Sequence, residues 1–94
     1  LTCHGVQLDL VHTCLEYGEK RVDLSKNELK ILHYLFQHAG EIVPRLDMIE
    51  HLWENQVFID DNTLSVNVTR IREKLKSIGV TRLIETKRGM GYRV

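Results

Sequence analysis

The segment from Asp60 to Val94 constrains the fold of this chain more than any other part of the sequence. Stepped at 100° per residue, five of its apolar residues fall within an arc of about 80°, the buried stripe of an amphipathic helix. These residues are Leu64, Val68, Ile71, Leu75 and Ile78. Asp60 or Asp61 is placed to cap this helix, and Gly79 to end it. The segment therefore predicts a long helix that packs against a core on one side only.

The other side of the predicted helix is polar except at one position. It carries Asn62, Val66, Thr69, Arg70, Glu73 and Lys76. Val66 lies at the centre of this face, where it has no core to enter. Beside Thr69 and Arg70 it suits a surface that reads DNA bases. An alternative for Val66 is contact with a neighbouring loop or with a dimer partner.

A β-hairpin is expected after this helix. Its strands should cover residues 83–86 and 91–94, around the basic turn Lys87-Arg88-Gly89-Met90. Basic side chains and two glycines at a hairpin tip predict a mobile, positively charged projection.

The residues before the long helix predict a small sheet and two shorter helices. Val6, Leu8 and Leu10 alternate with polar residues, and 17–20 suits a tight turn, so three or four antiparallel strands are expected. A capping box of Ser25 and Glu28 begins a helix. After a short strand at residues 42–43, Pro44 fits the start of a second helix. The residues expected on its buried side are Leu46, Ile49, Leu52 and Trp53.

Three helices followed by a β-hairpin make a winged helix-turn-helix, so the expected class is α+β. The 94 residues form one domain, which we place at residues 1–94. Because the chain begins at Leu1 rather than Met, we expect it to be part of a longer protein.

Charge is unevenly distributed, although the net charge is zero. Residues 1–59 have a balance of −4, and residues 60–94 have a balance of +4. Binding to a polyanion needs a basic surface rather than a basic chain, so this asymmetry favours a nucleic-acid partner for the second part. A solvated face without a partner is the alternative.

Several classes of site and function have no support in the sequence. The two cysteines, Cys3 and Cys14, and the five histidines lack the spacing of a zinc site, so no metal or cofactor is expected. No catalytic constellation is recognisable, so an enzyme is not expected. No apolar run approaches the ~20 residues that span a bilayer, so no membrane partner is expected.

Two motifs resemble those of the effector domains of OmpR/PhoB-family bacterial response regulators. NVTRIREKL in the long helix and IETKRGMGYRV in the hairpin match the family pattern N-V-x-R-x-R-x-K-L followed by I-E-T-x-x-G-x-G-Y-R. LSKNELKIL and GEIVPRLDMIEHLW resemble the family as well. Within it, DNTLSVNV and IETKRGMGY are similar to regulators of the BceR/GraR type, which respond to bacitracin and antimicrobial peptides.

The resemblance implies a four-stranded N-terminal sheet, three helices and a C-terminal hairpin wing. It also implies a phosphorylated receiver domain upstream, homodimers on direct-repeat half-sites of double-stranded DNA, and a location in the bacterial cytoplasm. In this family, the connection that corresponds to residues 54–59 can contact RNA polymerase. Its apolar residues Val57, Phe58 and Ile59 could equally pack under the long helix.

Helix geometry and resemblance together indicate which residues contact DNA. In the major groove, base contacts are expected from Val66, Asn67, Thr69 and Arg70. Backbone contacts are expected from Arg45, Trp53, Thr63, Ser65, Arg72, Lys74, Thr86, Lys87 and Arg88, the last two also reaching the minor groove.

Two of these positions, and the function itself, have alternatives. Trp53 could anchor the core or donate its indole N–H to phosphate, and the resemblance favours both. Arg45 could simply be solvated. A winged helix that binds another protein instead of DNA is the alternative function, suggested by the zero net charge and by the apolar residues at 57–59.

Overall fold

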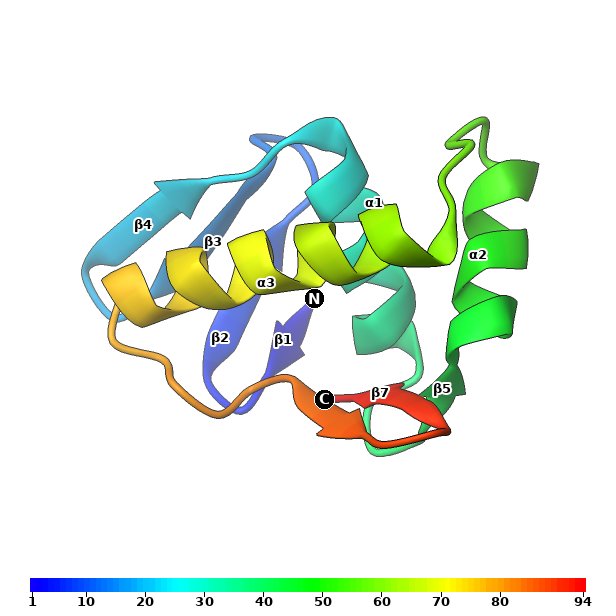
Figure 1. Cartoon of the computed structure of the whole chain (residues 1–94). Coiled ribbons are helices and arrows are strands. Elements are labelled where there is room, and N and C mark those ends of the chain that lie inside the picture. Colours follow the sequence, from blue (N-terminus) through cyan, green and yellow to red (C-terminus); the bar gives the residue numbers. More distant parts are fainter.

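The computed structural model describes all 94 residues as three helices and two antiparallel sheets (Figure 1). The first sheet has the order β1 (Thr2–Cys3), β2 (Val6–Asp9), β3 (Cys14–Tyr17) and β4 (Lys20–Asp23). The helices are α1 (Lys26–Gln37), α2 (Arg45–Glu54) and α3 (Asp61–Ser77). The second sheet has the order β5 (Val43–Pro44), β7 (Gly91–Arg93) and β6 (Glu85–Lys87). This arrangement confirms the predicted α+β winged helix-turn-helix.

The first sheet turns one apolar face toward the core. Leu8 pairs with Leu15 across β2 and β3, and both side chains are buried. Leu10, which the alternating pattern placed on the same strand, is instead 42% exposed. Asp9 explains the difference, because its carboxylate accepts hydrogen bonds from the backbone amides two and three residues later. These bonds end the strand in a turn before Leu10 can pair.

α1 begins at the predicted capping box. The Ser25 hydroxyl accepts from the backbone N–H of Glu28 at 3.2 Å, and the Glu28 carboxylate accepts from the backbone N–H of Ser25 at 2.7 Å. The residues that α1 contributes to the core are Ile31, Leu32, Leu35 and Phe36.

α2 buries only part of the side predicted for it. Met48 and Leu52 are fully buried, whereas Leu46 is 66% exposed and Trp53 is 52% exposed. Ile49 packs against the core but is only partly buried. Met48 and Leu52 lie four residues apart and therefore share a helix face. The predicted set does not include Met48. The predicted buried face is therefore rotated about the helix axis relative to the observed one.

The loop between α2 and α3 places its apolar residues on two sides. Val57 and Ile59 belong to the core, whereas Phe58 is 63% exposed. The ring of Phe58 meets that of Trp53 edge to face, with their centroids 5.3 Å apart. Val57 and Ile59 therefore pack into the core, and Phe58 remains on the surface.

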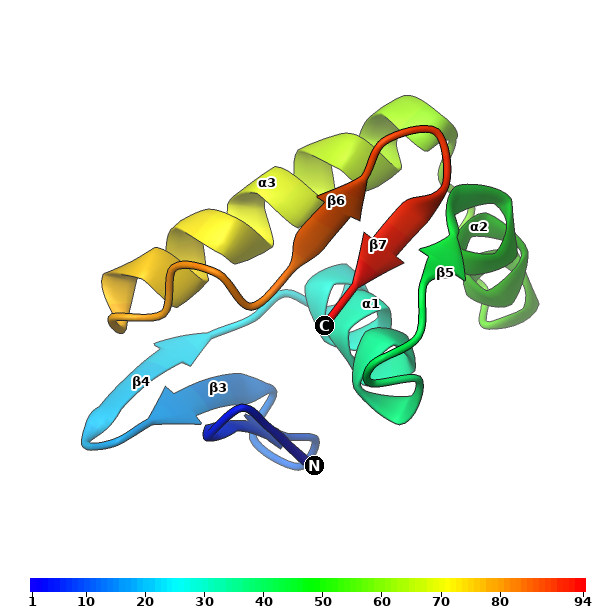
Figure 2. The same ribbon diagram turned by 90° about the horizontal axis from the view of Figure 1, so that it is seen from below.

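The wing formed by β6 and β7 runs beside α3 and joins β5, as Figure 2 shows. Val43 pairs with Tyr92, and Pro44 pairs with Gly91. Glycine is required at position 91, because a Cβ there would lie 2.0 Å from the carbonyl oxygen of Val43. The short strand expected at 42–43 is thus shifted by one residue, and it connects the wing directly to the start of α2.

One core of 23 buried residues joins both sheets and all three helices. It includes Leu8, Leu35, Leu52, Ile71 and Tyr92, which come from five different elements. No helix combines the length and the apolar character needed to cross a membrane.

Candidate nucleic-acid interface

α3 is held so that one side of it faces solvent. The Asp60 carboxylate accepts the backbone N–H of Thr63 at 2.7 Å, and Gly79, with a φ of +91°, follows the end of the helix. The predicted stripe is at most 3% exposed at each position. Its members are Leu64, Val68, Ile71, Leu75 and Ile78. Burial of this whole stripe leaves the opposite side of α3 free for a ligand.

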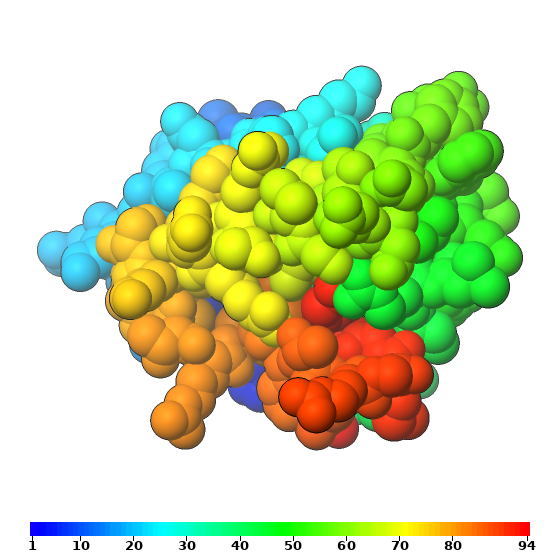
Figure 3. All heavy atoms as spheres, viewed as in Figure 1, coloured from blue at the N-terminus to red at the C-terminus, as the bar shows by residue number.

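Three of the four predicted base-reading residues lie on this free side. Val66 is 45% exposed, and Thr69 and Arg70 are exposed as well. The Thr69 hydroxyl donates to the carbonyl oxygen of Ser65 at 3.0 Å, which leaves its oxygen able to accept. Arg70 has no hydrogen-bond or ion-pair partner within the chain. Figure 3 looks onto this face, where α3 crosses the molecule with the wing below it.

Asn67 is the exception, and the expectation that it reads bases is corrected. Its side chain is 6% exposed, and its amide donates to the carbonyl oxygen of Thr63 at 2.9 Å. At 100° per residue Asn67 lies only about 20° from Ile78, at the edge of the buried stripe. Its amide N–H is therefore bound within the helix, and little of the side chain is open to a ligand.

The wing presents a single free cation at its tip. Lys87 pairs with Glu85 at 3.1 Å, and Glu85 also accepts from Arg93 at 3.2 Å. Hydrogen bonds from Lys87 and then from Arg93 lower the pKa of the Glu85 carboxyl. Arg88 is exposed and has no partner within the chain. A contact of Lys87 with a ligand would have to replace, or add to, its pair with Glu85.

Arg45 lies near this surface but is already bound within the chain. Its guanidinium donates to the carboxylate of Asp61, to the hydroxyl of Ser65 and to the hydroxyl of Tyr92, each at 2.5 Å. The hydrogen bond with Asp61 raises the pKa of Arg45. The free, solvated side chain that we considered for Arg45 is therefore not observed. Ser65, a predicted backbone contact, is part of the same network.

Arg72 and Lys74, two further predicted backbone contacts, also have internal partners. Arg72 donates to the carbonyl oxygen of Ile84 at 3.0 Å and to the hydroxyl of Thr86 at 2.5 Å. Lys74 donates to the carboxylate of Glu28 at 2.5 Å. Any contact of these two cations with phosphate would have to replace, or add to, these bonds. Thr86 itself is exposed.

Trp53 lacks the first of the two roles predicted for it, as a core anchor, and its contact with phosphate remains a prediction. It is 52% exposed and so does not anchor the core, and its indole N–H donates to the carbonyl oxygen of Ile59 at 3.0 Å. That bond fixes the loop before α3, and the ring of Phe58 packs against the indole of Trp53. Thr63, in contrast, lies exposed in the first turn of α3 with its hydroxyl free of partners.

Sequence reasoning missed two residues that organise this surface. Asp61 and Tyr92 both bind Arg45, from positions 16 and 47 residues away in the chain. No local spacing could indicate such contacts. The sequence pattern predicts a strand for Tyr92 and indicates no partner for its hydroxyl.

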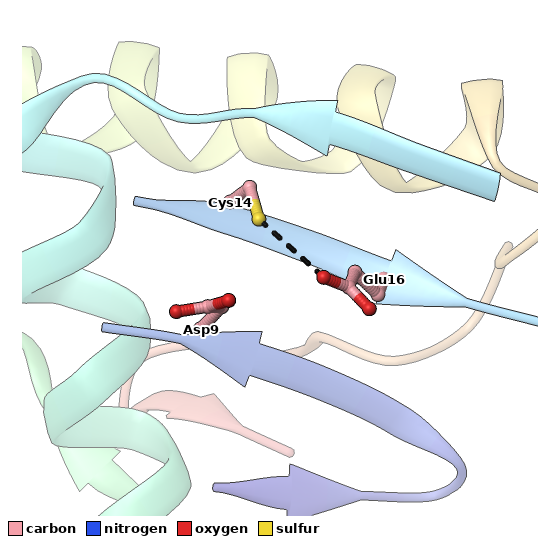
Figure 4. A group of neighbouring side chains, drawn as sticks. All are labelled: Asp9, Cys14 and Glu16. Atoms are coloured by element: carbon pink, nitrogen blue, oxygen red, sulfur yellow. Dashed lines mark hydrogen bonds between the residues drawn. The ribbon is translucent and has the colours of Figure 1, made fainter. Parts of the chain in front are cut away.

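A separate group of possible metal ligands lies on the outer side of the first sheet (Figure 4). Ligand atoms of Asp9, Cys14 and Glu16 are within 4.8 Å of one another, and the thiol of Cys14 is 3.9 Å from Glu16. Asp9 is already used in the fold, because it binds His12 at 2.8 Å and the backbone of the turn. The turn thus accounts for Asp9, and the expectation that the chain binds no metal remains a prediction.

The family of C-terminal domains of transcriptional regulatory proteins matches residues 18–94. The chain belongs to this family. It is 42% identical over 92 residues to the response regulator protein GraR of Staphylococcus aureus (strain MRSA252), covering 98% of this chain and 41% of GraR. It is 51% identical over 88 residues to the sensory transduction protein BceR of Halalkalibacterium halodurans, covering 94% of this chain and 38% of BceR. The predicted resemblance to OmpR/PhoB-type regulators of the BceR/GraR kind is confirmed.

Two solved structures of response-regulator or DNA-binding domains share the fold. The C-terminal domain of the nisin resistance regulator NsrR, a lantibiotic response regulator, has a TM-score of 0.90 at 44% identity, covering 99% of this chain and 94% of that one. The DNA-binding domain of Klebsiella pneumoniae RstA, in complex with the RstA box, has a TM-score of 0.80 at 28% identity, covering 99% and 93%. The chain spans about two fifths of the length of GraR and BceR.

Proposed function

We propose that this effector domain binds double-stranded DNA in a sequence-specific manner and so regulates transcription in a two-component system. The observation that carries the proposal is the open side of α3, where Val66, Thr69 and Arg70 face solvent beside the basic wing. The RstA domain, solved with its DNA box, supports it. The domain acts by binding, and nothing in its geometry calls for catalysis.

Each exposed residue of α3 suits a particular feature of the major groove. Arg70 can donate two hydrogen bonds to guanine O6 and N7, and Val66 can pack against the methyl group of thymine. Thr69 offers a hydroxyl oxygen that can accept a hydrogen bond, because its proton is donated to Ser65. Asn67 has no part in this proposal, because its amide is bound to the backbone of α3.

Contacts to the DNA backbone are assigned to groups at the edges of α3 and on the wing. Thr63, Lys76 and Arg88 are exposed and free, while Lys87 and Thr86 stand on β6. The wing reaches the neighbouring minor groove or its phosphates. The other predicted backbone contacts already have hydrogen-bond partners within the chain, so their first role is to hold the surface in place. They are Ser65, Arg45, Trp53, Arg72 and Lys74.

The remaining parts of the proposal concern the whole protein. We assign the domain to residues 1–94, preceded by a receiver domain, in a regulator that forms homodimers on direct-repeat half-sites. Such a regulator works in the bacterial cytoplasm. The surface at residues 54–59, where Phe58 is 63% exposed, is the proposed contact with RNA polymerase.

Selection of bound duplexes from random DNA tests the proposal, and Arg70→Ala tests the base-reading role. The variant should lose about 1–3 kcal/mol on the selected site and should tolerate any base at one position. Arg88→Ala is the matched control, because loss of a wing cation should weaken all duplexes similarly. An unchanged ratio of selected-site to random-site affinity in Arg70→Ala would show that Arg70 reads no base.

A winged helix that binds a protein partner is the second candidate function. The exposed aromatic pair of Trp53 and Phe58 favours it, because two large rings outside the core suit a protein contact. Failure of the domain to enrich any duplex at low salt would favour this candidate over the first.

A further inference from the structure

Two arginines connect the wing to the helices on either side of it. Arg72, from α3, donates to the carbonyl oxygen of Ile84 at 3.0 Å and to the hydroxyl of Thr86 at 2.5 Å. Arg45, from the first turn of α2, donates to the hydroxyl of Tyr92 on β7 at 2.5 Å. The guanidinium carbon of Arg45 also lies 5.2 Å from the centroid of the Tyr92 ring. Each strand of the wing is therefore held by one arginine.

Backbone pairing attaches the wing to the rest of the domain on one side only. β7 lies between β5 and β6, and it pairs with both. β6 is the outer strand, and Figure 2 shows it beside α3. A helix satisfies its own backbone groups, so it cannot form a ladder with a strand edge. The side chain of Arg72 supplies the hydrogen bonds that join this edge to α3, one to Thr86 on β6 and one to Ile84 just before it.

We propose that Arg72 and Arg45 are positioning residues, which hold the tip of the wing at a fixed place relative to the open side of α3. The inference rests on the proposed DNA binding, in which α3 and the wing enter neighbouring grooves together. A wing that is ordered before binding loses less freedom when the complex forms. Loss of either arginine should therefore weaken binding without a direct contact between that arginine and DNA.

The free domain provides the first test, by amide hydrogen exchange in Arg72→Met. Exchange in the wing, residues 85–93, should become about tenfold faster, as expected when a hydrogen bond to a charged group is lost. Exchange in the first sheet should not change. Lys76→Met is the matched control, because Lys76 is an exposed cation of α3 with no partner in the chain. Unchanged exchange in the wing of Arg72→Met would overturn the proposal.

Binding to a selected duplex provides the second test, in a cycle with Arg88→Ala at the wing tip. If Arg72 acts through the wing, Arg72→Met should weaken binding about tenfold in the unmodified domain. In the Arg88→Ala background, where the wing tip has lost its free cation, it should weaken binding less than about twofold. If Arg72 instead contacts phosphate directly, Arg72→Met should reduce the affinity by the same factor in both backgrounds, and that result would refute the positioning role. Lys76→Met is the control, and it should reduce the affinity by the same factor in both backgrounds.

If Arg72→Met fails to fold, hydrogen exchange in Thr86→Val tests the same bond. It removes the acceptor of the Arg72 bond without changing any charge, and Thr86→Ser should restore slow exchange in the wing. Tyr92→Phe tests the Arg45 bond in the same way. If the unmodified domain enriches no duplex, the proposed function fails, and the exchange measurement still decides whether these arginines hold the wing.

Discussion

At the scale of single residues, Glu28 carries the most consequential charge inside the fold. It is 2% exposed, caps α1 through Ser25 and accepts a hydrogen bond from Lys74 of α3. Burial alone would raise the pKa of Glu28, but the hydrogen bonds from Lys74 and Ser25 outweigh burial and lower it. The ionised form thus connects the first helix of the domain to its DNA-facing helix.

Stability should depend on pH through this residue. Because the pKa of Glu28 is lowered in the folded state, its contribution is complete above the unfolded pKa of about 4.3 and is lost as pH falls through the folded value. Glu28→Gln should unfold more easily at neutral pH, by about 1.5–3 kcal/mol, and less of its stability should be lost in acid. Urea unfolding at a series of pH values measures both effects.

Glu73→Gln is the control for this experiment, since Glu73 is an exposed carboxylate of α3 without a partner. It should leave the stability at neutral pH nearly unchanged. If the stability of Glu28→Gln fell in acid as steeply as that of the unmodified domain, Glu28 would not be the group that titrates.

At the scale of elements, the sequence predicts those helices whose ends and buried faces are set by local patterns. α1 and α3 have a capping residue and an apolar stripe, and both helices form close to where these patterns place them. α2 has a weaker pattern, because Leu46 and Trp53 are apolar but exposed. The surface beside α3 was harder to predict, because pairs such as Arg72 with Thr86 and Lys74 with Glu28 form only when distant segments pack.

Gly91→Ala should detach the wing from β5. The added Cβ would meet the carbonyl oxygen of Val43 at 2.0 Å and the Cα of Pro44 at 2.8 Å, and backbone atoms cannot move aside as a flexible side chain could. We expect a loss of about 1–3 kcal/mol in the free energy of unfolding, as for other overpacked sites. Met90→Ala, at an exposed neighbouring position, is the control for urea unfolding. Equal stabilities of the two variants would argue against this close approach.

At the scale of the whole molecule, a net charge of zero hides two halves of opposite sign. The excess of acidic residues belongs to residues 1–59, which form the first sheet and two helices. The excess of basic residues belongs to residues 60–94, which form α3 and the wing strands β6 and β7. A polyanion should therefore approach the domain from the side of α3 and the wing.

Salt should weaken DNA binding despite the neutral chain. Each neutralised phosphate releases counterions, so the logarithm of the affinity should fall against the logarithm of salt concentration by about 0.9 per contact. Several contacts predict a slope of several units, and Arg88→Ala should reduce it by about one. Titrations at four or more salt concentrations measure the slope. A slope near zero would mean that net charge, rather than its distribution, governs binding.

Trp53 gives this domain a built-in optical probe. It is the only tryptophan in the chain, and it lies outside the core with its indole bound to the loop before α3. Its fluorescence should therefore report on the surroundings of the α2–α3 loop more than on the packing of the interior. A protein that covers Phe58 should shift this emission, whereas a ligand confined to the wing should leave it nearly unchanged. Emission and circular dichroism recorded on one sample would then separate events at the loop from loss of the fold.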